Sequence, residues 1–204
     1  DMEAYQGHGG LAAGHGVPIL WPLIMEGGFQ VNAEGRRFSD ESAGYSEQAA
    51  KVNAQPGRVA WSIFDERLHV LMSAFDDYRD ALRAGAIVSA PTLAALARTL
   101  KIPFKALAET CRAVAAAAAN GTPDEFGRLF AASHLLAAPY YAAKVTGALF
   151  HTQGGLEVDE DGRVRKRAGG TFANLYAGGG AARGVSGGGA SGYMAGNGLL
   201  TATT

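Results

Sequence analysis

The placement of glycine is the feature that most constrains this sequence. The chain contains 29 glycines, which make up nearly half of positions 178–198 and recur between positions 7 and 28. Glycine at this density costs chain entropy, and in a globular protein it marks tight turns or close approach of the backbone to a ligand. A flexible low-complexity linker is the alternative. Because Tyr193, Leu199 and Leu200 interrupt the C-terminal run with side chains that favour burial, we favour ordered loops.

The composition is that of a globular protein without an evident macromolecular partner. The 204 residues are 48% hydrophobic and carry a net charge of −1 without a run of like charges, so we expect a small-molecule substrate and no nucleic acid. Cys111 is the only cysteine, which excludes an intrachain disulfide and a cysteine-based metal site and fits a cytoplasmic protein. No apolar stretch approaches the roughly 18 residues that span a bilayer. Because the chain begins at Asp1, we expect a piece of a longer protein.

The middle of the chain predicts helices. Residues 46–54 favour helix. Thr92 is placed to cap a helix that begins at Leu93, and apolar residues at spacings of three and four predict a second helix from Phe104 to Asn120. A further helical segment is predicted at residues 125–136.

Strands are predicted on both sides of these helices. Residues 28–38 predict a hairpin with its turn at Ala33 to Gly35, and residues 59–64 and 142–150 predict longer strands. Shorter strands are predicted at residues 156–158, 164–165 and 175–176. The sum is an α+β module followed by a glycine-rich β segment.

Five side chains are candidates for chemistry: His8, His15, Tyr45, His151 and Tyr193. Among the histidines, His151 is well placed, because it ends an apolar strand and precedes a double glycine. No Gly-x-Ser-x-Gly elbow is present with the right spacing, which disfavours a hydrolase. No glycine fingerprint for a dinucleotide lies within a βαβ unit.

Three motifs in order resemble those of one enzyme superfamily. Residues 28–41 resemble the "VN-x-x-G-x-RF-x-x-E" hairpin of FAD-dependent fumarate reductases, L-aspartate oxidases and 3-ketosteroid dehydrogenases. Residues 151–159 are similar to that group's "H-T-x-GG-L-x-x-D", and residues 174–179 to its flavin-facing "G-LYA-x-G". The chain thus resembles the C-terminal part of a flavoprotein of the fumarate reductase and succinate dehydrogenase superfamily.

This resemblance implies a two-domain architecture. We expect residues 1–8 to end a segment of the FAD domain, and residues 9–150 to form a capping (substrate) domain of helices and a small sheet. Residues 151–204 are expected to form the C-terminal, β-rich portion of a split Rossmann-like FAD-binding domain. The expected FAD contacts are Gly154, Gly155, Tyr176, Ala177, Gly178, Gly179, Asn197, Gly198 and Leu199.

The resemblance also implies an absent partner. The N-terminal FAD-binding half is expected to precede Asp1. We therefore expect the chain alone to retain no FAD, to be inactive and to self-associate through apolar surface that normally meets this half.

The substrate positions depart from those of fumarate reductases. His8 and His151 match the histidines that bind the substrate carboxylate in that group. The neighbouring Thr-Glu pair falls on Leu20 and Trp21, which we do not expect to donate to a carboxylate or to balance its charge. Two further arginines of the family fall on Tyr45 and near Tyr193, so the bidentate carboxylate clamp is lost. A C4 dicarboxylate is therefore disfavoured as the substrate.

The two tyrosines resemble those of the 3-ketosteroid dehydrogenase branch. This similarity implies a flavin-dependent dehydrogenase or reductase of a carbon–carbon bond next to a carbonyl. Tyr45 would act as acid or base, Tyr193 and His151 would orient the substrate oxygen, and hydride would pass between substrate and FAD.

Three alternatives stay open. The first is a flavoenzyme for a di- or tricarboxylate, such as a fumarate reductase-like or tricarballylate dehydrogenase-like protein, with the substrate bound by His8, His151 and a residue from the missing half. The second is a non-catalytic binding module. In a third arrangement, Tyr45 and Tyr193 merely pack under the cap.

Overall fold

The computed structural model describes residues 5–152, 154–178 and 181–183, and it divides the chain into two compact units. One unit comprises Asp1–Gly7 and Leu149–Thr204, and the other comprises His8–Ala148. These boundaries lie one and two residues from those expected at residues 8 and 150. The roles assigned to the two parts stay a prediction.

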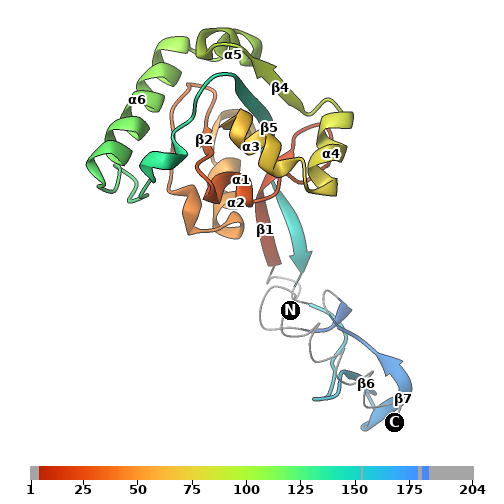
Figure 1. Cartoon of the computed structure of the whole chain (residues 1–204). Helices are drawn as coiled ribbons and strands as arrows, with labels where there is room; N and C mark the ends of the chain where they lie inside the picture. Colours follow the sequence, from red (N-terminus) through yellow and green to blue (C-terminus); the bar gives the residue numbers. More distant parts are fainter. Residues whose placement is uncertain (1–4, 153, 179–180, 184–204) are drawn as a thin grey trace. The chain divides into compact units, whose positions relative to one another are not determined.

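A sheet of five strands forms the centre of the unit at residues 8–148, and two of its strands continue past the unit's boundaries (Figure 1). The strands are β1 (Tyr5–Ala12), β2 (Phe29–Val31), β3 (Ala60–Asp65), β4 (Ile87–Ala90) and β5 (Tyr140–Thr152). Their order is β1-β5-β3-β2, and β4 pairs with β5. The pairs β2–β3, β3–β5 and β4–β5 are antiparallel.

Alternation along β3 explains why both faces of this sheet are covered. Ala60 and Phe64 belong to one hydrophobic cluster, and Trp61 and Ile63 belong to the other. Since side chains of a strand alternate between faces, a strand that is buried along its whole length must have packing partners on both sides.

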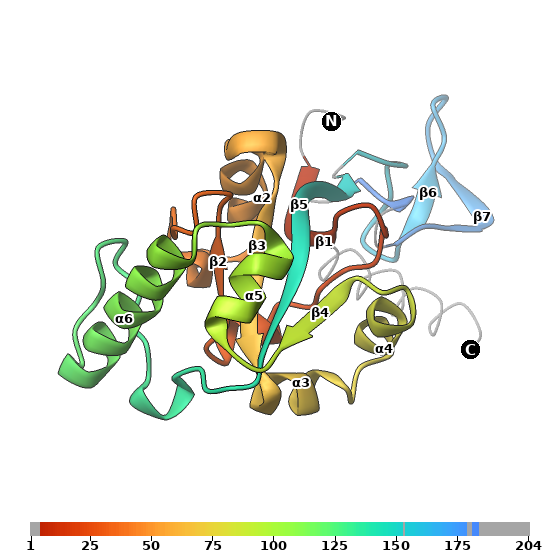
Figure 2. The same ribbon diagram turned by 90° about the horizontal axis from the view of Figure 1, so that it is seen from above.

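The helices supply these two layers. They are α1 (Pro22–Met25), α2 (Tyr45–Asn53), α3 (Glu66–Met72), α4 (Asp76–Arg83), α5 (Leu93–Leu100) and α6 (Phe104–Asn120). Buried side chains of α1 to α4 join the cluster of Phe64, and those of α5 and α6 join the cluster of Trp61. Figure 2 shows α5 and α6 next to one another, apart from α3 and α4.

Several predicted helices and their caps are confirmed. Thr92 accepts a hydrogen bond from the backbone nitrogen of Ala95 and begins α5, and Gly121 ends α6 in the left-handed conformation with φ +63°. The helix predicted at residues 46–54 is α2. Local sequence decides these three elements.

The predicted hairpin at residues 28–38 is wrong in its second half. Only β2 forms, and its partner is β3. The chain after the turn leaves the sheet because Arg37 is buried in ion pairs with Glu41 and Asp124.

The helix predicted at residues 125–136 is also wrong. Asp124 accepts hydrogen bonds from the backbone nitrogens of Phe126 and Arg128, Gly127 has φ +90°, and only a 3-10 turn, Ala132–His134, follows. The side-chain hydrogen bonds of Asp124 thus hold the segment in a turn.

The other unit contains a two-stranded antiparallel sheet, β6 (Arg163–Arg165) and β7 (Thr171–Tyr176). Gly169 and Gly170, both with positive φ, form the turn between them. The strand expected at residues 156–158 is reduced to isolated bridges from Leu156 and Val158. The mixed helix and strand content of the described residues confirms the expected α+β class.

Helix length sets a limit on membrane insertion. No helix within the described residues combines the length and the apolar character that a membrane crossing requires.

Candidate functional site

Two of the sequence-predicted residues, His8 and Tyr45, come together in the unit at residues 8–148. His8 lies on β1 and is 4% exposed, and Tyr45 is the first residue of α2 and is half-buried. Their ring centroids are 5.2 Å apart, with the planes tilted by 31°. The two side chains that the resemblance implies for substrate binding and proton transfer are therefore neighbours in the structure.

Trp21 is the third aromatic side chain of this site. Its ring meets His8 edge-on at 5.7 Å and Tyr45 at 6.2 Å, and Leu20 packs against the same hydrophobic core. The expectation that Trp21 cannot donate needs correction, because an indole nitrogen is a hydrogen-bond donor. Within the described residues the Nε1 atom of Trp21 is buried and has no acceptor. The three rings form what we call the aromatic triad, His8, Trp21 and Tyr45.

His8 is a neutral imidazole with a defined tautomer. Burial lowers its pKa, which disfavours the charged form. Its Nδ1 atom accepts a hydrogen bond of 3.1 Å from the backbone nitrogen of Gly10, so the ring proton is on Nε2. Nε2 is therefore the donor of the ring, and burial disfavours its charged form.

Gly10 is required for this geometry. A Cβ atom at Gly10 would lie 2.9 Å from the carbonyl oxygen of Ile19 and 3.1 Å from Cε1 of His8. The first of these contacts is with backbone and cannot relax cheaply. Gly10 thus allows the close approach of backbone that holds His8 in place.

A cluster of four buried charges lies beside the triad. Arg37 donates to both carboxylate oxygens of Glu41 at 3.0 and 2.7 Å, Arg128 donates to Glu41 at 2.8 Å, and Asp124 completes the set by pairing with Arg37. These residues carry two positive and two negative charges. We call them the charge quartet: Arg37, Glu41, Asp124 and Arg128.

The charge quartet connects the elements that carry Trp21 and Tyr45. Arg128 donates 2.6 Å to the carbonyl oxygen of Ile24 in α1, and Glu41 lies one turn before α2. Burial lowers the pKa of Arg128, and the carboxylate of Glu41 opposes this effect. Arg37 and Glu41 of the "RF-x-x-E" motif therefore belong to the cluster that links the segments carrying Trp21 and Tyr45.

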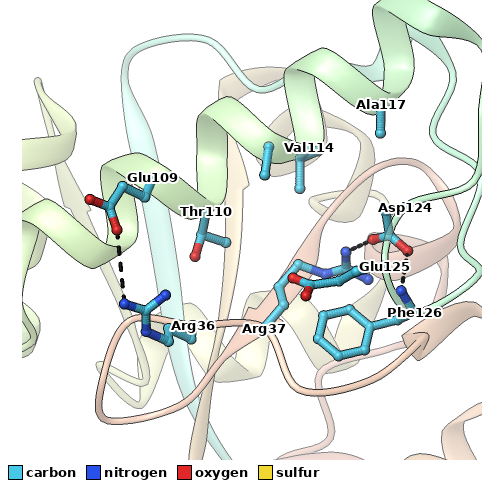
Figure 3. Close-up of a pocket in the computed structure, with 10 residues that line it drawn as sticks. Arg36, Arg37, Glu109, Thr110, Val114, Ala117, Asp124, Glu125 and Phe126 are labelled. Carbon is cyan, nitrogen blue, oxygen red and sulfur yellow. Dashed lines mark hydrogen bonds and ion pairs between the residues drawn. The ribbon is translucent and has the colours of Figure 1, made fainter.

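The described pocket beside the quartet is separate from the triad. It has a volume of about 420 Å³, and Figure 3 shows Arg36 paired with Glu109 and Arg37 paired with Asp124 in its wall. None of the residues predicted from the sequence to carry chemistry lines it.

The predicted FAD contacts are described only in part. Gly154 is buried, Tyr176 ends β7 and Ala177 is 7% exposed, with Gly178 following. The side chain of His151, at the end of β5, and all of Gly179, Tyr193, Asn197, Gly198 and Leu199 lie outside the described residues. The FAD contacts of all nine residues, and the roles of His151 and Tyr193, stay predictions.

Gly155 lies against the chain's own backbone. A Cβ atom there would be 2.7 Å from the carbonyl oxygen of Ala181 and 2.7 Å from the carbonyl carbon of Ala182. Leu156 donates to Ala181, and Arg183 donates to Leu156. The His-Thr-x-Gly-Gly segment and the segment after Tyr-Ala-Gly thus lie side by side.

Three of the predicted FAD contacts fit one part of the cofactor. Gly154, Ala177 and Gly178 carry no side chain larger than a methyl group, which is compatible with the approach of a flat ring. The space that a side chain at Gly155 would occupy is filled by the chain's own backbone. Contact of these residues with the flavin ring stays a prediction.

Sequence reasoning missed Trp21, Gln30 and Gln48 as parts of this site. The donor chemistry of the indole was available as a signal for Trp21. Gln48 lies three residues after Tyr45 and therefore on the same side of α2. Nothing local distinguishes Gln30 from any strand residue.

Known proteins resemble the chain in sequence. It is 30% identical to the fumarate reductase (cytochrome) of Shewanella frigidimarina over 176 residues, which are 86% of this chain and 30% of the relative. It is 28% identical to the 3-oxosteroid 1-dehydrogenase of Mycobacterium tuberculosis, with 79% of this chain and 35% of that protein covered.

A solved structure agrees with these relatives. The open conformation of a flavocytochrome c3 fumarate reductase matches with a TM-score of 0.72 and 25% identity, over 98% of this chain and 37% of that one. The chain thus spans well under half the length of each of these proteins. The model of the family described as "FAD binding domain" matches residues 2–199. The chain therefore belongs to the FAD binding domain family, whose cofactor is FAD, within the superfamily of fumarate reductase and succinate dehydrogenase flavoproteins.

Proposed function

We propose that the protein is a flavin-dependent dehydrogenase or reductase that acts on a carbon–carbon bond next to a carbonyl. The observation that carries this proposal is the His8–Tyr45 pair, in which a neutral imidazole lies against a phenol in a site lined by a third ring. When bound, FAD accepts or supplies the hydride.

The chain's own residues have distinct roles in this proposal. The phenol of Tyr45 takes or gives the proton at the carbon next to the carbonyl. His8 donates from Nε2, and Trp21 from its otherwise unmatched Nε1, to the substrate oxygen as negative charge develops there. Tyr193 and His151 are proposed to orient the same oxygen.

The charge at the site favours a carbonyl over a carboxylate. Recognition of a carboxylate is strongest with a cation, above all a bidentate arginine. The aromatic triad supplies no positive charge while His8 is neutral. The nearby buried arginines, Arg37 and Arg128, are both paired with Glu41.

A di- or tricarboxylate substrate is the second candidate. It is supported by the 30% identity to a fumarate reductase and by the TM-score of 0.72 with another. Under this proposal His8 and His151 bind the substrate together with a residue that does not come from the described part of the chain.

Substrate-dependent colour change of the flavin separates the candidates. The full-length protein, loaded with flavin, is mixed anaerobically with 3-ketosteroids, and bleaching of the oxidised flavin is recorded. In a second arm, the same protein with chemically reduced flavin is mixed with fumarate or tricarboxylates, and reoxidation of the flavin is recorded. We expect reaction with ketosteroids and not with carboxylates. Reaction with carboxylates alone would replace the first candidate by the second, and failure of the full-length protein to retain any flavin would favour a binding module.

A further inference from the structure

A chain of buried amide hydrogen bonds lies between the strand that carries His8 and the helix that carries Tyr45. Gln30 and Gln48 are 0% and 1% exposed, and neither takes part in the proposed chemistry. Nε2 of Gln48 donates to Oε1 of Gln30 at 3.0 Å, and Nε2 of Gln30 donates to the carbonyl oxygen of Gly9 at 2.9 Å. The first amide belongs to α2 and the second to β2.

The carbonyl oxygen of Gly9 fixes the direction of this chain of bonds, because a carbonyl oxygen can only accept. Oε1 of Gln30 therefore accepts from Gln48, and the hydroxyl of Ser39 donates to Oε1 of Gln48 at 2.9 Å. At the other end, Nε2 of Gln30 also donates to the hydroxyl of Ser62 at 3.3 Å. Reversal of either amide would place two donors or two acceptors face to face.

Each end of the chain is next to a residue of the aromatic triad. Gly9 is the neighbour of His8 in sequence, and Gln48 follows Tyr45 by three residues on one side of α2. A Cβ atom at Gly9 would lie 2.8 Å from Cβ of Gln48, so β1 and α2 are in direct contact at Gly9. The hydrogen bond from Gln30 to Gly9 therefore lies at the contact between β1 and α2.

We propose that Gln30 and Gln48 are positioning residues that hold the ring of His8 at its distance of 5.2 Å, between ring centroids, from the ring of Tyr45. They act through the peptide of Gly9 and the first turn of α2. Their catalytic consequence rests on the function proposed above, but their geometric role does not. A buried amide pair of this kind could instead serve stability alone, so the test must observe His8 directly.

Nuclear magnetic resonance of the 204-residue protein provides that observation without flavin or substrate. Residues 8–148 have their own two-sided core, so the site is present in this chain. The variant Gln48→Met keeps an unbranched side chain of similar length and removes both hydrogen bonds. The matched control is Gln55→Met. Gln55 lies just beyond the C-terminal end of α2 and is hydrogen-bonded to Asn32 and Lys51, so the same substitution is made away from His8 and Tyr45.

In Gln48→Met we expect the nuclear Overhauser effects between the His8 and Tyr45 rings to be lost. We also expect the pKa of His8, read from its ring nitrogen shifts, to rise toward the ordinary value of about 6.5 as the strand moves away. Gln55→Met should retain the ring contacts and the pKa of the parent protein.

If Gln48→Met does not fold, Ser39→Ala tests the same relationship more gently. It removes only the hydrogen bond from Ser39 to Gln48, and we expect the same changes at reduced size. A folded Gln48→Met or Ser39→Ala protein with unchanged His8 contacts, tautomer and pKa would overturn the proposal. Loss of turnover in every flavin-loaded variant, the parent included, would reject the proposed function and leave this result intact.

Discussion

The ring centroids of His8 and Tyr45 lie 5.2 Å apart, although His8 comes from the strand β1 and Tyr45 from the start of the helix α2. The contact brings a defined donor to an acid or base candidate. It is the basis of the predictions that follow.

Replacement of Tyr45 by Phe should remove the proton transfer and keep the ring that packs against the core. We expect the rate of flavin reduction by a ketosteroid to fall by about 10²- to 10⁴-fold, with substrate affinity little changed. Rapid-mixing spectroscopy under anaerobic conditions measures both quantities. Tyr141→Phe, at a tyrosine whose hydroxyl bonds Glu66 and not the triad, is the control. Full activity in Tyr45→Phe would exclude the proposed role.

Trp21→Phe should have opposite effects on stability and on binding. An unmatched buried donor costs about 1–3 kcal/mol, so its removal offsets the lost packing and the free energy of unfolding should stay equal or rise. Substrate affinity should fall, because one donor to the substrate oxygen is lost. Urea unfolding and flavin-monitored titration measure the two effects. A large loss of stability with unchanged affinity would assign Trp21 to packing alone.

The neutral state of His8 predicts a pH dependence of stability. Burial lowers the folded pKa below the unfolded value of about 6.5, so between these values only the unfolded chain binds the proton. Stability contributed by His8 is therefore present above pH of about 6.5 and is lost as the pH falls through this window. We expect the parent protein to lose more free energy of unfolding than His8→Phe between about pH 7 and about pH 5. Equal pH slopes in urea unfolding would contradict this assignment.

The charge quartet predicts a strong effect of removing one member. Arg128→Met leaves Glu41 buried with Arg37 as its remaining ion-pair partner, and we expect a loss of about 3 kcal/mol in the free energy of unfolding. Arg83→Met breaks an exposed pair with Asp80 and should change stability by less than about 1 kcal/mol. Urea unfolding of both variants at one pH makes the comparison. Similar losses in the two would argue against a dominant role for the buried cluster.

Local signals predicted the helices, and long-range contacts caused the errors. Thr92 and Gly121 fix the ends of α5 and α6 by hydrogen bonding and backbone conformation within a few residues. The second strand of the hairpin fails because Arg37 pairs with Asp124, far along the chain. No window of sequence around residue 37 contains that information.

The same division holds for the site. Resemblance to a family identified His8 and Tyr45, because their places relative to the "RF-x-x-E" motif can be read directly. Gln48 was missed because its significance depends on what lies opposite it in space, whereas the indole donor of Trp21 could have been read from the sequence. The approach of His151 and Tyr193 to the site stays a prediction.

The glycines under α2 also limit how the site can move. A side chain at Gly9 would meet Gln48, and one at Gly147 of β5 would meet the backbone oxygen of Ala49 and the side chain of Asn53. The helix is therefore seated on two strands at van der Waals distance and has no gap in which to slide. A displacement of this unit as a whole would therefore carry phenol and imidazole as one rigid body and would leave the spacing of the two rings unchanged.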